Sequence, residues 1–210
     1  MKNIEVEFRF KVEDEEKINN FLKRLTFVKR KTQNDIYFDT PLGDFYKKGI
    51  FMRNRNNKSL DFKFNLEDIE NKHEECEEFS FSLPISENDL EKINRVCKII
   101  GLESLMTANL EDFLKTNNLK ELVIIDKTRD VYRDGIFSFC LDDIKGFGKF
   151  LEIETMLDDD KNLESLKKTM LQKISTLNPK LLPIGYIELF IKEKDFNLYK
   201  QGRFLLEEDN

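Results

Sequence analysis

Charged and apolar residues alternate over the first stretch of the chain, from Ile4 to Val12. Successive side chains of a β-strand point to opposite faces, so this alternation predicts a strand with one apolar and one charged face. The charged face carries Glu5, Glu7, Arg9 and Lys11. Two acids and two bases on one face are compatible with a solvated strand. They also suit a site where metal ions meet an anionic substrate.

The same kind of pattern predicts seven further strands along the chain. They cover Asp35–Asp39, Ile50–Arg55, Ser59–Asn65, Glu74–Leu83, Leu122–Tyr132, Ile136–Asp142 and Phe147–Met156. Two short segments, Asn56-Asn57 and Asp134-Gly135, are typical of tight turns between antiparallel neighbours.

Apolar residues at helical spacing predict five helices between and after these strands. The helices cover Glu15–Leu25, the segment from Ser86 to Gly101, Leu105–Leu114, Leu163–Leu177 and a last segment that begins near Gly185. An α+β fold accounts for this order: an antiparallel eight-stranded closed β-barrel with helices packed outside. We expect residues 1–204 to form one domain and the acidic tail, residues 205–210, to be loosely attached.

The signs of the charges segregate between the predicted strands. Acids pair as Glu5/Glu7 and Glu152/Glu154, whereas bases pair as Arg53/Arg55 and Lys127/Arg129. Because helices are available to cover the apolar faces, the charged faces can line the interior of the barrel. Buried charges are costly unless they are paired or bound to ions and ligands. The pattern therefore favours a wet tunnel that holds a polyanion, gripped by arginine and lysine, together with hard divalent cations.

The fifth predicted strand is ambiguous in register. If Phe79 and Phe81 face outward, then Glu74 and Glu78 face inward; a slip of one residue turns Glu75 and Glu77 inward instead. We favour the register that places Glu78 inside.

Composition excludes several other classes of function. A net charge of −6 argues against duplex nucleic acid as a partner. No apolar run reaches membrane-spanning length and the first residues do not resemble a signal peptide, so we expect a cytoplasmic protein. The three cysteines show no metal-binding spacing, and the single histidine, His73, is interpreted as a surface residue. Zinc chemistry and a Ser-His-Asp triad are therefore disfavoured.

Seven segments, taken in order, resemble the motifs of the CYTH superfamily, the triphosphate tunnel metalloenzymes. They are Glu5–Lys11, Gln33–Pro41, Phe51–Arg55, Leu60–Lys63, Lys127–Arg129, Leu141–Glu154 and Tyr186–Leu189. The second and sixth segments resemble most the class IV adenylate cyclase branch of that family. Two departures stand out: Arg9 replaces the family's lysine, and the fifth strand lacks the family's arginine.

The resemblance implies roles for particular residues. Glu5, Glu7, Arg9 and Lys11 would form the catalytic strand. One or two Mg²⁺ or Mn²⁺ ions would be held by Glu152 and Glu154 with Glu5 and Glu7, and Glu78 and Asp142 would be further acidic contacts at the metal. The residues that would bind the triphosphate are Arg53, Arg55, Lys63, Lys127 and Arg129. We interpret Asp35 and Asp39 as strand-end or turn residues and Tyr186 as a plug of the barrel.

The resemblance implies an enzyme that acts on triphosphates, and an adenylate cyclase that forms cyclic AMP and pyrophosphate is the first hypothesis. A triphosphatase acting on tripolyphosphate, thiamine triphosphate or a nucleoside triphosphate is the alternative. A non-catalytic polyphosphate- or nucleotide-binding module is a further alternative, because Arg9 and the fifth strand depart from the family pattern. The sequence also leaves open whether the protein forms a homodimer.

Overall fold

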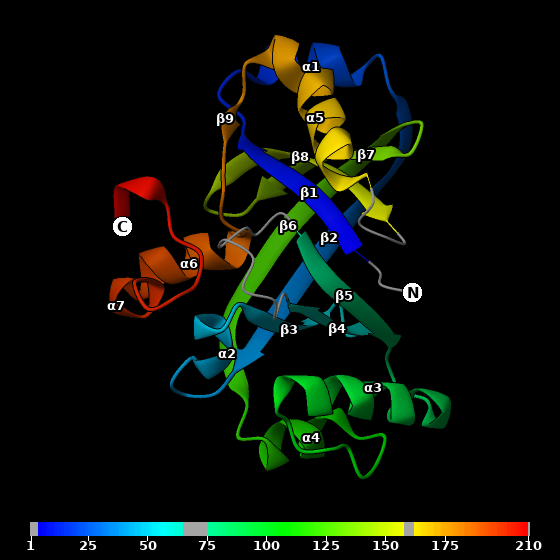
Figure 1. Cartoon of the computed structure of the whole chain (residues 1–210), viewed down its shortest axis with the longest axis vertical. Helices are drawn as coiled ribbons and strands as arrows, with labels where there is room; N and C mark the ends of the chain where they lie inside the picture. Colours follow the sequence, from blue (N-terminus) through cyan, green and yellow to red (C-terminus); the bar gives the residue numbers. More distant parts are fainter. Residues whose placement is uncertain (1–3, 65–74, 158–161, 210) are drawn as a thin grey trace.

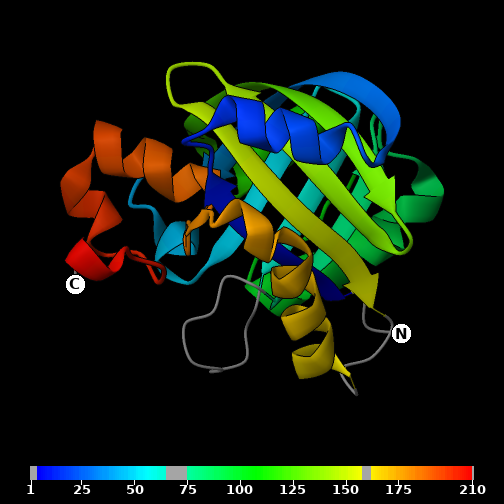
Figure 2. The same cartoon turned by 90° about the horizontal axis from the view of Figure 1, so that it is seen from above.

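Eight antiparallel strands close into a ring in the computed structural model, which describes residues 4–64, 75–157 and 162–209 (Figures 1 and 2). The strands are β1 (Ile4–Lys11), β2 (Thr26–Asp39), β3 (Ile50–Arg55), β4 (Ser59–Phe64), β5 (Glu75–Ser82), β6 (Lys120–Asp134), β7 (Phe137–Ile144) and β8 (Gly148–Leu157). Their order is β5-β4-β3-β2-β6-β7-β8-β1, and β1 pairs in turn with β5. A two-residue strand, β9 (Lys180–Leu181), pairs with the other end of β1. The predicted α+β class and the closed antiparallel sheet are confirmed.

Helices cover the outside of the ring in three groups (Figure 1). The first group is α3 (Glu87–Ile100) and α4 (Leu110–Thr116), which pack on β3, β4 and β5. The second is α1 (Glu15–Leu22) and α5 (Leu163–Ile174), which pack on β1, β7 and β8. The third is α2 (Asp44–Lys47), α6 (Tyr186–Lys194) and α7 (Phe196–Tyr199). Within the described ranges, no helix is long and apolar enough to span a membrane.

The alternation in β1 shows why the charged faces turn inward. Val6, Phe8 and Phe10 are buried against Ile18 of α1 and Met170 of α5. The intervening charged residues must then point to the other face, which is the interior of the ring. Burial of apolar surface under the external helices, at about 25 cal/mol per Å², stabilises this arrangement and leaves the interior to polar groups.

Two strands are longer than the sequence predicts. β2 begins at Thr26 rather than Asp35, and β6 covers Lys120–Asp134 rather than Leu122–Tyr132. The first residues of β2 are mostly exposed and have no buried apolar face, so alternation does not mark them. They are held instead by pairing with β6 and by a salt bridge of 2.5 Å between Arg30 and Asp130. This partner contact cannot be read from β2 itself.

Two other segments differ from the predictions. The helix predicted from Leu105 begins only at Leu110, because the Asn109 side chain accepts hydrogen bonds from two backbone amides there and caps the helix. The sequence predicts a loosely attached tail, whereas Leu205 and Leu206 pack against the core cluster around α6 and α7. A short 3-10 helix, Glu207–Asp209, follows, and Asp209 forms a salt bridge of 2.5 Å with Lys192.

The structure also places the fifth strand. In β5, Phe81 is buried in the outer core and Glu78 lies inside the ring, as does Ser80, whose hydroxyl donates to Asp61 at 2.6 Å. This is the register that the sequence analysis favours. Two residues named there, His73 and Glu74, lie outside the described residues, as does the side chain of Glu75.

Candidate functional site

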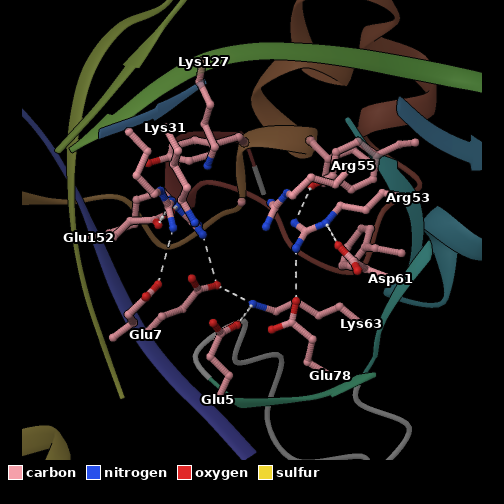
Figure 3. Close-up of a pocket in the computed structure, with 18 residues that line it drawn as sticks. Glu5, Glu7, Lys31, Arg53, Arg55, Asp61, Lys63, Glu78, Lys127 and Glu152 are labelled. Carbon is pink, nitrogen blue, oxygen red and sulfur yellow. Dashed lines mark hydrogen bonds and ion pairs between the residues drawn. The ribbon is translucent and has the colours of Figure 1, made fainter. Parts of the chain in front are cut away.

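The interior of the ring holds a cavity of about 160 Å³ with a highly charged wall (Figure 3). Among the described residues, seven basic and six acidic side chains line it. The basic ones are Arg9, Lys31, Arg53, Arg55, Lys63, Lys127 and Arg129. The acidic ones are Glu5, Glu7, Asp61, Glu78, Glu152 and Glu154. Tyr37, Phe51, Gly185, Tyr186 and Ile187 complete the wall.

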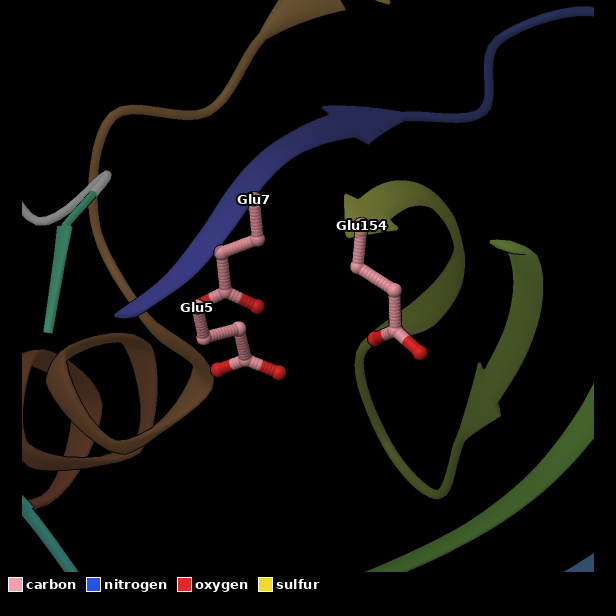
Figure 4. Close-up of side chains that lie close together, drawn as sticks. All are labelled: Glu5, Glu7 and Glu154. Atoms are coloured by element: carbon pink, nitrogen blue, oxygen red, sulfur yellow. The ribbon is translucent and has the colours of Figure 1, made fainter. Parts of the chain in front are cut away.

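Three carboxylates gather at one place on this wall (Figure 4). Glu5 and Glu7 come from β1 and Glu154 from β8, where Glu7 and Glu154 are cross-strand partners. One oxygen of each lies within 4.8 Å of the others. We call these three residues the carboxylate triad. Three oxygen donors from neighbouring side chains are the kind of ligand set that Mg²⁺ and Mn²⁺ prefer.

The charge balance of the triad favours binding of a cation. Lys63 donates to Glu5 and to Glu7, each at 2.6 Å. Burial raises the pKa of Glu5 to about 8, and the carboxylates of Glu7, Glu78 and Glu154 act in the same direction against Lys63. Burial also raises the pKa of Glu154, with Glu152 and Glu7 adding to the effect against Arg129. A divalent cation would remove this repulsion.

Two arginines of β3 form a second group, on the opposite wall in Figure 3. Arg55 donates through two nitrogens to Asp35, both at 2.7 Å. Arg53 donates to Asp61 at 2.9 Å and to Glu78 at 3.1 Å. Burial alone would raise the pKa of Asp35, but the Arg55 hydrogen bonds and the charge of Arg53 outweigh it and lower that pKa. These carboxylates hold the two guanidinium groups in place inside the ring.

A third group connects β1, β6, β7 and β8. Arg9 donates to Glu152 at 2.6 Å and to Glu7 at 3.0 Å. Arg129 donates to both oxygens of Asp142, at 2.6 and 2.5 Å, and also to Glu152. Burial alone would raise the pKa of Glu152, but the charges of Arg129 and Arg9 outweigh it and lower that pKa well below its ordinary value. Glu152 therefore stays ionised between two arginines.

Arg9 occupies the position at which the CYTH motif has a lysine. Its guanidinium group is larger than an ammonium group and contacts more partners. Besides its two carboxylate partners, it donates to the backbone carbonyl of Ile184 at 2.8 Å. Only a guanidinium has enough donors in a planar fork to reach three partners in this way. Arg9 thus links β1 to the segment that leads into α6.

Two lysines of the wall have lowered pKa values. Burial and the charge of Arg129 lower the pKa of Lys127, although Asp142 accepts from its ammonium group at 2.9 Å. Burial, Arg129 and Arg55 lower the pKa of Lys31. An anion bound between these lysines and Arg129 would offset the charge of Arg129 and favour the charged form of both lysines. The cationic part of the wall is therefore complementary to a phosphate chain.

Tyr186 closes the wall at the beginning of α6. Its ring lies 4.5 Å from the Arg9 guanidinium carbon and 4.8 Å from the Lys127 nitrogen, both measured to the ring centroid. The Phe150 and Tyr186 rings form a T-shaped pair with 5.2 Å between their centroids. Burial, with Glu152 and Asp142, raises the pKa of the Tyr186 hydroxyl, which therefore stays protonated at neutral pH.

The structure brings together most of the residues that the sequence singled out. Those that line the cavity are Glu5, Glu7, Arg9, Arg53, Arg55, Lys63, Glu78, Lys127, Arg129, Glu152 and Glu154. Asp142 lies behind the wall, fully buried and paired with Arg129 and Lys127. Lys11 is the exception: it is exposed and lines a different, outer pocket beside Lys180 and Glu207. The inward face of β1 therefore contributes to the cavity only as far as Arg9.

Sequence reasoning missed several residues of the wall. Lys31 lies in the part of β2 that alternation did not mark, and Asp61 was not given a role. The sequence predicts Asp35 to be a strand-end residue; it does not line the cavity but is buried behind the wall, where it holds Arg55. Asp39 does behave as a turn residue, because it accepts from the backbone amides of Phe45 and Tyr46. The signal in the sequence is the pair Arg53 and Arg55: two arginines on the same face of a strand need acidic partners when that face is buried.

Comparison with known proteins identifies relatives that match most of this chain and nearly all of their own length. A protein of Methanocaldococcus jannaschii, named as a candidate adenylate cyclase, is 28% identical over 191 residues, which are 89% of this chain and 98% of that protein. A conserved hypothetical protein of Pyrococcus furiosus has a similar structure, with 28% identity and a TM-score of 0.59 over 88% of this chain and 99% of its own.

A third similar structure is more distant in sequence. It is a candidate adenylyl cyclase from Hippeastrum, described as having a dominant triphosphatase activity, with 18% identity, a TM-score of 0.56 and 98% of each chain covered. At this identity the likeness shows a common fold. The CYTH domain matches residues 3–182, most of the 210-residue chain. The protein therefore belongs to the CYTH domain family.

Proposed function

We propose that this protein is a divalent-metal-dependent enzyme that acts on triphosphates inside the ring. The observation that carries the proposal is a carboxylate triad in the same small cavity as seven basic side chains. The triad is suited to a hard cation and the basic groups are suited to phosphate oxygens. Membership of the CYTH domain family supports the same assignment.

The residues present fit Mg²⁺ or Mn²⁺. Glu5, Glu7 and Glu154 would hold the ion through carboxylate oxygens, and Lys63 would shift from these carboxylates toward the substrate. A bound ion would supply charge neutralisation for the phosphate oxygens and an activated oxygen nucleophile. Glu152 and Asp142, which the sequence analysis placed at the metal, have a different role in this proposal: they hold Arg9, Arg129 and Lys127 in place.

The basic side chains would bind the phosphate chain. Arg53 and Arg55 would approach it from one wall and Lys127 from the other (Figure 3), and Arg129 lies on the same strand as Lys127. Because most of these groups already have carboxylate partners, they are ordered before substrate arrives. Preorganised charges of this kind stabilise phosphoryl transfer, in which positioning and charge neutralisation supply most of the catalysis.

We propose conversion of ATP to cyclic AMP and pyrophosphate as the reaction. The 3′-hydroxyl oxygen of the ribose would form a bond to the α-phosphorus and release its proton. The bond from the α-phosphorus to the oxygen of the β-phosphate would break, and pyrophosphate would leave with that electron pair. The name of the M. jannaschii relative, which matches over nearly its whole length, supports this reaction.

A triphosphatase is the second candidate, and the size of the cavity favours it. The volume of about 160 Å³ is smaller than the roughly 300–1,000 Å³ of pockets that enclose drug-sized ligands. A phosphate chain suits this space better than a whole nucleotide. The oxygen of a water molecule would then form a bond to the terminal phosphorus and give up a proton to solvent. The bond from that phosphorus to the bridging oxygen would break, so that orthophosphate and the shortened phosphate chain are the products. The Hippeastrum protein, which has the same fold, is described as having such an activity.

Product analysis separates the two reactions. The purified protein is incubated with ATP and, separately, with tripolyphosphate, each with Mg²⁺ or Mn²⁺, and the products are separated by chromatography. The cyclase proposal predicts cyclic AMP and pyrophosphate from ATP. Orthophosphate without cyclic AMP would instead identify a triphosphatase, and metal-dependent binding without any product would identify a binding module.

A matched pair of variants tests the role of the triad. Glu154→Gln keeps the size of the side chain and removes a charged metal ligand, so we expect turnover to fall roughly a hundredfold or more. Glu193→Gln, on the exposed surface of α6, serves as the control and should leave turnover unchanged. Equal activity of the two variants, with both folded by thermal melting, would contradict the assignment of the triad.

A further inference from the structure

The hydroxyl of Tyr186 is buried inside the ring without a hydrogen-bond partner among the described residues. The residue is only 6% exposed and lines the cavity. Nearly all buried polar groups in folded proteins are hydrogen-bonded, because an unsatisfied buried hydroxyl costs free energy. A hydroxyl in this position therefore indicates a ligand atom that completes its hydrogen bonding.

The ring of Tyr186 is fixed before any ligand arrives. Arg9 and Lys127 contact its π-system, and the Phe150 ring packs against it in a T-shaped pair. Tyr186 is also the first residue of α6, directly after Gly185, so its backbone is held by the helix. These contacts leave the hydroxyl little freedom to find another partner.

The hydroxyl is protonated at neutral pH and can donate a hydrogen bond. Glu152 and Asp142 act on it electrostatically, and Arg9 and Arg129 act in the opposite direction. Each of the two acids already accepts from Arg129, whereas Arg9 and Lys127 also contact the Tyr186 ring. The ligand atom that fits here is an acceptor oxygen rather than a metal ion, and the basic side chains beside the ring suit a phosphate oxygen.

Tyr186 and the carboxylate triad lie toward opposite ends of the same path. Along β1, Arg9, which contacts Tyr186, lies four residues from Glu5 and two from Glu7; at about 3.3 Å per residue these separations are about 13 Å and about 7 Å. On β8, the direction from Glu154 through Glu152 to Phe150 also ends at Tyr186. A linear polyphosphate held at the triad would extend along this path.

We propose that Tyr186 is a specificity-determining residue whose hydroxyl donates a hydrogen bond to the phosphate group farthest from the carboxylate triad. This inference rests on the proposed function and adds to it a selection for chain length. A triphosphate contacts the triad at one end and Tyr186 at the other. A diphosphate held at the Glu5 end of the triad spans less of this path and has no third phosphate group for the tyrosine.

The test compares the binding of a longer and a shorter phosphate chain to one conservative variant. Tyr186→Phe keeps the ring and its contacts with Arg9 and Lys127 and removes only the hydroxyl. Binding of tripolyphosphate and of pyrophosphate is measured by calorimetric titration with Ca²⁺, and chromatography verifies that the chains remain intact. Tyr132→Phe, on a partly exposed residue of β6 that does not line the cavity, is the control.

We expect Tyr186→Phe to bind tripolyphosphate about tenfold more weakly than the wild type and to bind pyrophosphate within about twofold of it. An equal loss of affinity for tripolyphosphate and pyrophosphate, or no loss of affinity for either, would overturn the inference while leaving the proposed function intact. If the wild type fails to bind tripolyphosphate, the proposed function itself fails. Thermal melting of the variant verifies that the fold is unchanged.

Discussion

At the scale of single residues, Lys31 differs from the other basic groups of the cavity. Arg9, Arg53 and Lys63 each have carboxylate partners within 3.1 Å. Lys31 has no salt bridge among the residues that the structure describes, and burial, followed by Arg129 and Arg55, lowers the pKa of its ammonium group. A charge held in this way is costly in the free protein and is available to a ligand.

Replacement of Lys31 by glutamine should separate stability from binding. Below its lowered folded-state pKa, the ammonium is charged in both states and favours the unfolded chain, whose lysine pKa is about 10.4. That cost disappears as the pH rises through the folded and then the unfolded pKa. We therefore expect Lys31→Gln to melt at a higher temperature than the wild type at pH 7. The difference should vanish above about pH 10.5, and affinity for tripolyphosphate at pH 7 should fall about tenfold.

Lys29→Gln is the matched control for this prediction. Lys29 lies two residues earlier on the same strand, is exposed and does not line the cavity. Its replacement removes the same charge and should change neither the melting temperature nor the affinity appreciably. If Lys31→Gln melts at a lower temperature than the wild type at pH 7, Lys31 stabilises the free protein and this interpretation is wrong.

Most charged residues of the cavity were predictable because they alternate with apolar residues on buried strands. Glu5, Glu7 and Arg53 are examples, since external helices force their side chains inward. Lys31 and Asp35 were not found in this way. Lys31 belongs to an exposed extension of β2, and the role of Asp35 depends on Arg55, its partner on the next strand. The alignment of two neighbouring strands decides which residues face each other. The sequence of one strand alone does not reveal that alignment.

At the scale of elements, the ring is closed where β1 meets β5. Among the described residues, β1 and β8 form eight residue pairs, whereas β1 and β5 form three, from Ile4 to Val6. β1 then continues beside β9, with pairs at Phe10 and Lys11. Because this described pairing is short, we expect local opening of the ring to begin at this seam, the β1–β5 pairing.

Cysteine reactivity can report this opening. Cys76 lies in the seam, opposite Glu5, and burial raises the pKa of its thiol to about 12. Cys140 lies in β7, which pairs with β6 on one side and β8 on the other, and Cys97 lies on the buried face of α3. We expect a maleimide to label Cys76 first, with sites identified by mass spectrometry. Tripolyphosphate with Mg²⁺ should slow this labelling, because the triad includes two residues of β1.

The other two cysteines are internal controls for that experiment. Both are fully buried, so they react only when larger parts of the structure open. Labelling of Cys97 or Cys140 at the same rate as Cys76 would indicate global unfolding rather than opening of the seam. In that case the β1–β5 pairing is not the weak point of the ring.

Element boundaries followed from sequence where local signals exist. Gly101 ends α3 in a left-handed conformation, as its position predicts. The early residues of β2 and the tail after Phe204 are positioned by distant partners, β6 and the core around α6, and no local pattern announces them. Contacts with residues that are distant in sequence therefore fix the positions of these two segments.

At the scale of the whole molecule, the ring inverts the usual distribution of polarity. Phenylalanines and aliphatic residues face outward beneath helices, and the charged residues face a shared interior. Salt bridges offset part of the cost of burying these charges, but the triad and Lys31 remain incompletely compensated in the free protein. The interior as a whole is therefore suited to a metal ion and a polyanion that bind together.

Thermal melting with tripolyphosphate alone, Mg²⁺ alone and the two together tests this account most directly. A ligand that binds only the folded state stabilises it by RT ln(1 + [L]/Kd), about 2.7 kcal/mol when the free ligand is at a hundred times its Kd. Because the ion and the phosphate chain complete each other's sites, we predict that the two together raise the melting temperature by more than the sum of their separate effects. An unchanged melting temperature with both present would contradict the account.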